Sequence, residues 1–148
     1  SDYSAAIFAS CLAAESLTIW KDVPGVFNAD PKMFKDAKVY SHIPYVEALE
    51  MSYYGASVIH PKTIKPLQNA EIPLFVKSFS QPEDNGTRID GEPDFNTSFP
   101  AIIVKRDQML LSIRSPDLSF IDEAVLSSIF NVLSSANIKI NMMQVFGL

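Results

Sequence analysis

The sequence predicts an α/β protein in two parts, a parallel sheet with helices followed by a smaller α+β region. Between residues 2 and 79, apolar residues recur alternately at helical and at strand spacing, which is typical of a parallel α/β sheet. Residues 81–99 are polar, contain proline and glycine and have no apolar periodicity, which indicates a linker. Residues 101–143 then follow the order strand, strand, helix, strand, as in a small sheet covered by one helix.

The first part opens with a helix, a strand and a loop. Residues 2–14 are rich in alanine and have apolar side chains near helical spacing, and Ser1 fits the N-cap position. Residues 17–20 are short, apolar and partly β-branched, which predicts a buried strand. Residues 21–31 contain Asp, Pro, Gly and Asn, which together predict a loop.

Two further helices follow the loop. Ser41 and Pro44 suit the start of one helix, and Gly55 marks its end, because glycine is common just after a helix end. Pro61 is predicted to open the next helix, with Ile64 and Leu67 facing inward.

The remaining strands and the last helix are read from short apolar runs. Residues 72–79 predict a strand that has a proline near its start, where a strand tolerates one. In the second part, residues 101–105, 109–114 and 138–143 predict strands, and residues 122–136 have the apolar stripe of an amphipathic helix.

Composition excludes several classes of function. A net charge of −5 argues against nucleic-acid binding, which needs a cationic surface. No apolar run approaches the roughly 20 residues of a membrane span. The single cysteine, Cys11, cannot form an internal disulfide and suits a reducing, cytoplasmic location; its small, apolar neighbours predict a buried thiol. His42 and His60 lack partners at metal-ligand spacing, so no protein metal site is predicted and packing or capping roles are favoured.

The loop after Trp20 is a candidate ligand site. It leaves the carboxyl end of a predicted parallel strand, which is where ligands bind in open α/β sheets. Gly25 lets backbone approach a ligand closely, and Asp22 and Asp30 can accept hydrogen bonds from an amine or a ribose hydroxyl. Lys32 can meet a phosphate as a point charge. Spacing alone allows an ordinary surface loop equally well.

Several stretches, in order, resemble known kinases. Residues 22–32, Asp-Val-Pro-Gly-Val-Phe-Asn-Ala-Asp-Pro-Lys, resemble the nucleotide-binding segment of the amino-acid kinase family, which includes aspartokinases, glutamate kinases and uridylate kinases. Residues 1–4, Ser-Asp-Tyr-Ser, resemble the end of the aspartokinase Gly-Gly-Ser-Asp loop, and residues 47–63 are similar to a stretch of aspartokinases in particular. Residues 101–148 look like the opening of an ACT domain, a βαββαβ module that senses amino acids.

The resemblance implies a domain organisation. Residues 1–88 would form the C-terminal part of an amino-acid kinase domain, with a partial parallel sheet and helices, and residues 89–100 a linker. Residues 101–148 would begin an incomplete, ferredoxin-like α+β ACT regulatory domain. An incomplete sheet predicts association, since an unpaired apolar strand is a liability, and a homodimer or higher homo-oligomer is expected.

The implied activity is ATP-dependent phosphorylation of the side-chain carboxylate of L-aspartate, in the synthesis of lysine, threonine and methionine. Mg²⁺ would arrive with ATP, and an effector amino acid, lysine or threonine, would regulate the enzyme through the ACT region. The lysine- and glycine-containing segment that supplies much of the positive charge in this family is not in the sequence, so these 148 residues are predicted to be inactive alone.

The resemblance also implies site residues. Ser1 and Asp2 would lie beside the transferring phosphoryl group, with Asp2 orienting a catalytic lysine. The nucleotide would be lined by Lys21, Asp22, Gly25, Phe27, Asp30, Lys32 and Ser57. The effector would be held by Asp117, Leu118, Asp122, Ala124, Ile140, Asn141 and Gln144. Asn141 stands where lysine-sensing relatives often have Asp, while Gln144 could bond a threonine-like effector, so both effectors stay open.

Four residues depart from the family pattern. Phe27 stands where Tyr is common, and Lys32 where Arg is frequent. Lys21 stands where Thr or Ser is expected, and Ser57 where the family often has a phosphate-binding Lys. One option is that Lys21 supplies the charge that Ser57 does not.

Two other functions remain open. One is a non-catalytic module that binds an effector and dimerises through the ACT-like region. The other is a different enzyme of the amino-acid kinase family, such as glutamate kinase, against which the ACT-like tail and the His-Pro-Lys-Thr stretch at residues 60–63 argue.

Overall fold

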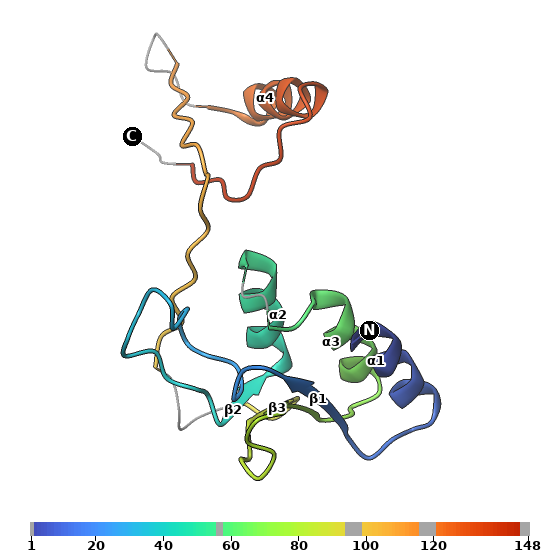
Figure 1. Cartoon of the computed structure of the whole chain (residues 1–148). Coiled ribbons are helices and arrows are strands. Elements are labelled where there is room, and N and C mark those ends of the chain that lie inside the picture. Colours follow the sequence, from blue (N-terminus) through green and yellow to red (C-terminus); the bar gives the residue numbers. More distant parts are fainter. Residues whose placement is uncertain (1, 56–57, 94–98, 116–120, 146–148) are drawn as a thin grey trace. The chain divides into compact units, whose positions relative to one another are not determined.

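The computed structural model describes residues 2–55, 58–93, 99–115 and 121–145, and the chain divides into two compact units, Ser1–Asp107 and Gln108–Leu148 (Figure 1). The elements are α1 (Asp2–Cys11), β1 (Leu17–Lys21), β2 (His42–Pro44), α2 (Tyr45–Tyr54), α3 (Pro61–Asn69), β3 (Leu74–Ser78), β4 (Thr87–Asp90) and α4 (Glu123–Ser135). This confirms the α/β class. Among the described helices, none has the length and apolar character needed to cross a membrane.

The sheet of the first unit has the strand order β1-β3-β4-β2. β1 runs parallel to β3, with Leu17 opposite Leu74, and β2 runs parallel to β4. β3 and β4 are antiparallel, with Leu74 opposite Ile89, so the sheet is mixed where a parallel one was expected. The reason is local: the short connection between β3 and β4 turns back through Gly86, which has a φ of +67°, and a connection of this length can join only antiparallel strands.

The sequence did not predict β2 and β4. β4 lies inside the polar stretch expected to be a linker, yet Thr87, Ile89 and Asp90 are all buried. β2 has only three residues. The burial of both strands comes from their sheet neighbours, and the local sequence has no alternating apolar pattern that would reveal it.

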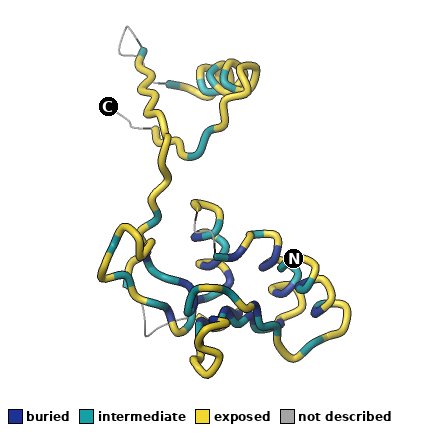
Figure 2. Tube along the Cα trace, viewed as in Figure 1, coloured by how far each residue is buried: buried dark blue, intermediate teal, exposed yellow. Residues whose placement is uncertain are grey.

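The core of the first unit lies between the sheet and the helices α1, α2 and α3, which lie on one side of the strands in Figure 1. Leu74, Val76 and Ile89 of the two central strands have no exposed surface. Ile64 and Leu67 of α3 are equally buried, which confirms their predicted inward orientation. Figure 2 shows the buried positions concentrated in this unit.

Helix α1 packs through small residues and leaves larger ones in solvent. Its buried side chains are Ala6 and Ala9, which allow it to lie close to α3. Phe8, and Leu12 directly after the helix, are 67% and 76% exposed, and Cys11 is exposed as well. The prediction of a buried thiol was therefore wrong, because Cys11 lies on the face of α1 that points away from the core.

The predicted ends of α2 and α3 are confirmed. α2 begins after Pro44 and stops at Gly55, whose φ of +127° favours glycine. α3 begins at Pro61 after His60, whose Nδ1 accepts a hydrogen bond from the amide of Lys62 at 3.1 Å. His60 is thus a capping residue.

Residues 101–148, predicted to begin an ACT domain, contain the predicted helix but not the predicted strands in their described parts. α4 is capped by Asp122, which accepts a hydrogen bond from the amide of Val125 at 2.8 Å. The described parts of residues 101–105, 109–114 and 138–143 form no strand, so an ACT-type sheet is not confirmed. A small sheet persists only when a second layer covers its apolar face, and α4 has no buried residue.

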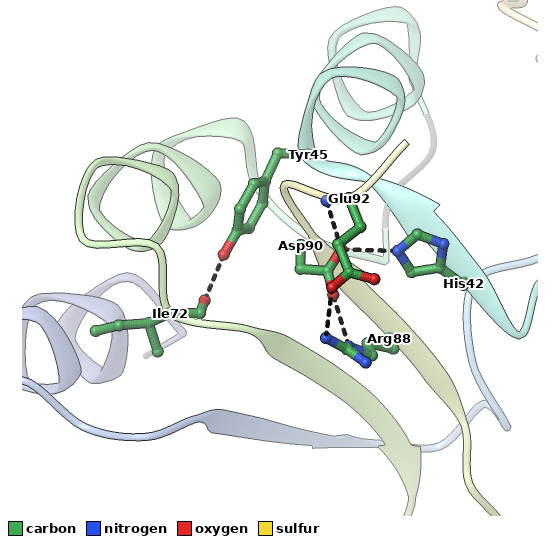
Figure 3. A network of polar contacts seen from close by, with 6 residues as sticks. All are labelled: His42, Tyr45, Ile72, Arg88, Asp90 and Glu92. Carbon is green, nitrogen blue, oxygen red and sulfur yellow. Dashed lines mark hydrogen bonds and ion pairs between the residues drawn. The ribbon is translucent and has the colours of Figure 1, made fainter. Parts of the chain in front are cut away.

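A polar network joins the ends of β2 and β4 around Asp90, whose side chain is only 7% exposed (Figure 3). Its Oδ1 lies 2.8 Å from His42 Nε2 and accepts a hydrogen bond from the Glu92 amide at 2.9 Å. Arg88 Nε lies 2.6 Å from Oδ2 as an ion pair, without hydrogen-bond geometry. Burial acts to raise the pKa of Asp90, but the bonds from His42 and Glu92 and the charge of Arg88 lower it below its usual value.

Replacing Asp90 by asparagine is expected to lower the free energy of unfolding by about 1–2 kcal/mol at pH 7, because the carboxylate's hydrogen bonds weaken. The pKa of Asp90 is lower in the folded state than in the unfolded state, where it is about 3.9. The ionised carboxylate therefore contributes its full stabilisation above the unfolded-state pKa, and this contribution is lost as the pH falls through the folded-state pKa. The difference between the variant and the wild type should therefore shrink below about pH 4 in urea titrations. Asp36→Asn, at an exposed loop position, is the control; an Asp90→Asn difference that stays constant down to pH 3 would exclude this account.

Candidate nucleotide and phosphoryl-transfer site

The carboxyl end of β1 meets the first turn of α1. Lys21, the last residue of β1, places its Nζ 2.6 Å from Oδ2 of Asp2. The two side chains are 27% and 31% exposed, so the pair lies at the surface edge of the sheet. Strand pairing with β3 fixes the backbone of Lys21, and the helix fixes that of Asp2. Two residues predicted to serve the nucleotide and the phosphoryl group are thus in direct contact.

The loop that follows β1 folds back on itself. Phe27 and Val39 form an isolated antiparallel bridge, and the Asn28 amide donates to the Lys38 carbonyl at 2.9 Å. At the tip, Asp30 Oδ1 accepts a hydrogen bond from the Lys32 amide at 2.9 Å. Five of the residues predicted to line a nucleotide therefore follow one another along this loop, whose two sides are paired through backbone hydrogen bonds: Asp22, Gly25, Phe27, Asp30 and Lys32.

Both ends of this loop are anchored on β4 by Thr87. Its Oγ1 accepts a hydrogen bond from the Val26 amide at 2.8 Å and donates one to the Tyr40 carbonyl at 2.6 Å, and both bonds are buried. Gly25 lies against the same side chain, and a Cβ there would collide with Thr87 Oγ1 and with Val39 Cγ1. The structure thus gives Gly25 a packing role. Sequence reasoning missed Thr87, since nothing in its polar surroundings indicated a buried anchor.

The far side of the loop is held by residues 99–102, here called the strap. Tyr40 donates a hydrogen bond to the Phe99 carbonyl at 2.9 Å, and the two rings stack with centroids 4.8 Å apart. The Asn28 side chain donates through Nδ2 to the Pro100 carbonyl at 3.3 Å, and the backbone carbonyl of Asn28 accepts a hydrogen bond from the Ile102 amide at 2.7 Å. These contacts therefore hold the loop against the strap.

Replacing Asn28 by alanine is expected to loosen the strap. The side chain accepts from the Lys38 amide at 2.7 Å and donates to Pro100, so its loss should cost about 0.5–1.5 kcal/mol and speed exchange of the Lys38 and Ile102 amides. Hydrogen exchange followed by NMR measures this. Asn69→Ala, at the exposed end of α3, should leave both amides unchanged; equal protection in the two variants would mean that the Asn28 side chain does not hold the strap.

The predicted residues are only partly described. Ser1 and Ser57, and the effector candidates Asp117 and Leu118, lie outside the described residues. Asp22, Asp30 and Lys32 are exposed, and Phe27 is half-buried. Among the other effector candidates, Asp122 caps α4, Asn141 bonds Gln108 at 2.5 Å, and Ala124 and Gln144 are exposed while Ile140 is half-buried. Within the described ranges, no group of three or more His, Cys, Asp or Glu residues could hold a metal ion.

This chain is similar in sequence to known proteins. The sequence pattern of the amino acid kinase family matches residues 1–78. A bifunctional aspartokinase/homoserine dehydrogenase from Buchnera aphidicola is 38% identical over 95% of this chain, and the lysine-sensitive aspartokinase 3 of Escherichia coli is 35% identical over 96%. The chain spans only 17% and 31% of the lengths of these two relatives.

Solved structures agree with the sequence matches. Aspartokinase III of E. coli in complex with aspartate and ADP superimposes with a TM-score of 0.78 and 34% identity, over 98% of this chain and 32% of that one. The same enzyme in complex with lysine and aspartate gives a TM-score of 0.77 over 99% of this chain and 33% of that one. The chain belongs to the amino acid kinase family, and these relatives, which match along nearly all of it, are aspartokinases.

Proposed function

We propose that this chain is part of an aspartokinase, which transfers the terminal phosphoryl group of ATP to the side-chain carboxylate of L-aspartate. The observation that carries the proposal is the contact between Asp2 and Lys21 at the carboxyl end of β1, directly before the nucleotide-type loop. The similarity to an aspartokinase solved with aspartate and ADP supports it. The product would enter the synthesis of lysine, threonine and methionine.

In this proposal the loop after β1 holds the nucleotide. The exposed carboxylates of Asp22 and Asp30 are available to ribose or amine donors, and the half-buried Phe27 offers a ring face to the purine. Lys32, at the exposed tip, would contact the β-phosphate as a point charge. Phosphoryl transfer depends mainly on such positioning and on positive charge around the moving group. Mg²⁺ carried by ATP would supply the remaining neutralisation.

Ser1, Gly25 and Ser57 complete the proposed site. Ser1 would lie beside the transferring phosphoryl group with Asp2, which would orient a catalytic lysine elsewhere in the protein. Gly25 would let the loop backbone approach the nucleotide while it packs on Thr87. The domain limits proposed are residues 1–88 for the kinase part, 89–100 for the linker and 101–148 for the start of an ACT domain.

The proposal extends to regulation. The E. coli relative was solved with lysine as well as aspartate, which supports an amino-acid effector here too. Lysine or threonine would bind through residues 117–124 and 140–144, in a cytoplasmic homodimer or higher homo-oligomer. A sensing and dimerisation module without catalysis is the second candidate, favoured by the exposed apolar residues of the second unit, among them Met109, Leu110 and Val132.

A thermal-unfolding panel tests the proposal on the 148 residues, with MgATP, L-aspartate, L-glutamate, L-lysine, L-threonine and L-methionine. A ligand at one hundred times its Kd should stabilise the folded state by about 2.7 kcal/mol, which raises the melting temperature by several degrees. MgATP is expected to stabilise the wild type and to act less on Asp22→Asn, with Asp36→Asn as the matched control. No response to MgATP would overturn the nucleotide site, and a response to glutamate but not aspartate would favour a glutamate kinase.

A further inference from the structure

Lys21 is held rigidly at the end of β1, which makes the position of its charge well defined. Its backbone is opposite Ser78 in the parallel pair with β3, and its carbonyl accepts a hydrogen bond from the Phe79 amide at 2.9 Å. Its ammonium lies 2.6 Å from Asp2. The charge is therefore fixed at the carboxyl edge of the sheet, where an open α/β sheet binds ligands.

The ammonium of Lys21 has capacity beyond this contact. An ammonium carries three N–H donors, and among the described residues the bond to Asp2 is the one that the side chain makes. The remaining donors lie at a surface that is partly open, since the side chain is 27% exposed. Lys21 can thus donate to Asp2 and to an incoming anion at the same time.

Asp2 needs a cation beside it if this edge is to receive a polyphosphate. A carboxylate near phosphate oxygens is repelled by them, and the repulsion strengthens as water is displaced. The first turn of α1 offsets part of that charge, but only by about 0.3–1 kcal/mol. Lys32 lies at the exposed tip of the loop, and among the described residues Lys21 is the cation that contacts Asp2.

We propose that Lys21 is a phosphate-binding residue that bridges Asp2 and the terminal phosphates of the nucleotide, and that this bridge lets Asp2 remain ionised beside them. The inference rests on the proposed function and adds a role that the position of the loop alone does not give. The bridge also predicts that the site binds ATP in preference to ADP. A cation at the strand end, adjacent to Asp2, should contact the terminal phosphate of ATP more than the inner phosphates.

Binding of MgATP and MgADP to the 148-residue chain, measured by calorimetry, tests this. Lys21→Met is expected to weaken MgATP binding by about tenfold or more, as loss of a charge-assisted bond does, and MgADP binding by clearly less. Lys21→Arg, which keeps the charge, should recover most of the loss. Lys65→Met, at an exposed position on α3, is the control and should bind both nucleotides like the wild type.

Asp2→Asn separates charge compensation from a structural role. Removal of the carboxylate frees the ammonium for phosphate, so this variant alone should bind MgATP more tightly than the wild type. The same change added to Lys21→Met should recover part of the lost affinity, because the uncompensated carboxylate is gone. A merely structural pair would instead lower the affinities for both nucleotides alike in either variant.

The outcomes distinguish the two proposals. A wild-type chain that binds neither nucleotide would overturn the proposed nucleotide site and this inference with it. A wild-type chain that binds MgATP while Lys21→Met matches the Lys65→Met control would overturn the inference alone. Equal losses of MgATP and MgADP affinity in Lys21→Met, without recovery by Asp2→Asn, would also overturn it.

Discussion

Replacing Gly86 by alanine is expected to destabilise the first unit by about 2–5 kcal/mol. A left-handed backbone conformation costs alanine about 1–2 kcal/mol, and overpacking by the added methyl group costs about 1–3 kcal/mol. Gly86 has a φ of +67° in the turn that leads into β4. A Cβ there would collide with the carbonyl oxygen of Val76 and lie 3.0 Å from its carbonyl carbon. The obstacle is backbone of the central strand β3, which cannot move without disturbing its pairing with both neighbours.

Urea unfolding followed by far-ultraviolet circular dichroism measures this effect. Gly91→Ala is a matched control, because Gly91 has no positive φ and, among the described residues, a Cβ there would meet only Tyr45 Cε2, at 4.0 Å. Its free energy of unfolding should stay within about 0.5 kcal/mol of the wild type. A Gly86→Ala variant as stable as the Gly91→Ala control would show that the chain can enter β4 without this turn, and the antiparallel β3–β4 pairing would then be in doubt.

The elements that the sequence predicted are those whose patterns are local. α3 has Pro61 at its start and a clear inward face, and β1 and β3 are short apolar runs with β-branched residues. β4 has one aliphatic residue in four, and it becomes a buried strand only because β3 and β2 pair with it on either side. Tertiary context of this kind overrides local propensity and cannot be read from four residues.

The candidate site was also predicted only where its residues form a local pattern in the sequence. The loop after β1 was predicted because its residue types and its place after a strand are visible in the sequence. The contact between Lys21 and Asp2 was not, because it depends on how α1 lies over the end of β1. The anchoring role of Thr87 was missed, since nothing in the neighbouring sequence marks a buried threonine that bridges two backbone groups far from it in the chain.

Replacing Thr87 by valine is expected to cost about 2–6 kcal/mol, because two buried backbone groups each lose their partner at about 1–3 kcal/mol. Valine has nearly the same shape, so no cavity forms. The Val26 amide and the Tyr40 carbonyl, at the two ends of the nucleotide-type loop, would each be left without their bond to the hydroxyl. The loop should then exchange its amide hydrogens faster, and MgATP should stabilise the variant less than the wild type.

Thr63→Val is the control that isolates the hydrogen bonds from the side-chain change. Thr63 is also fully buried, but its Oγ1 has no hydrogen-bond partner among the described residues. Removal of an unpartnered buried hydroxyl relieves a desolvation penalty, so this variant should be as stable as the wild type or more stable. Opposite signs for the two variants in urea unfolding would support the anchoring role of Thr87. Equal small effects would mean that the loop is held by the strap and by its own backbone pairing, and that its anchor on β4 is dispensable.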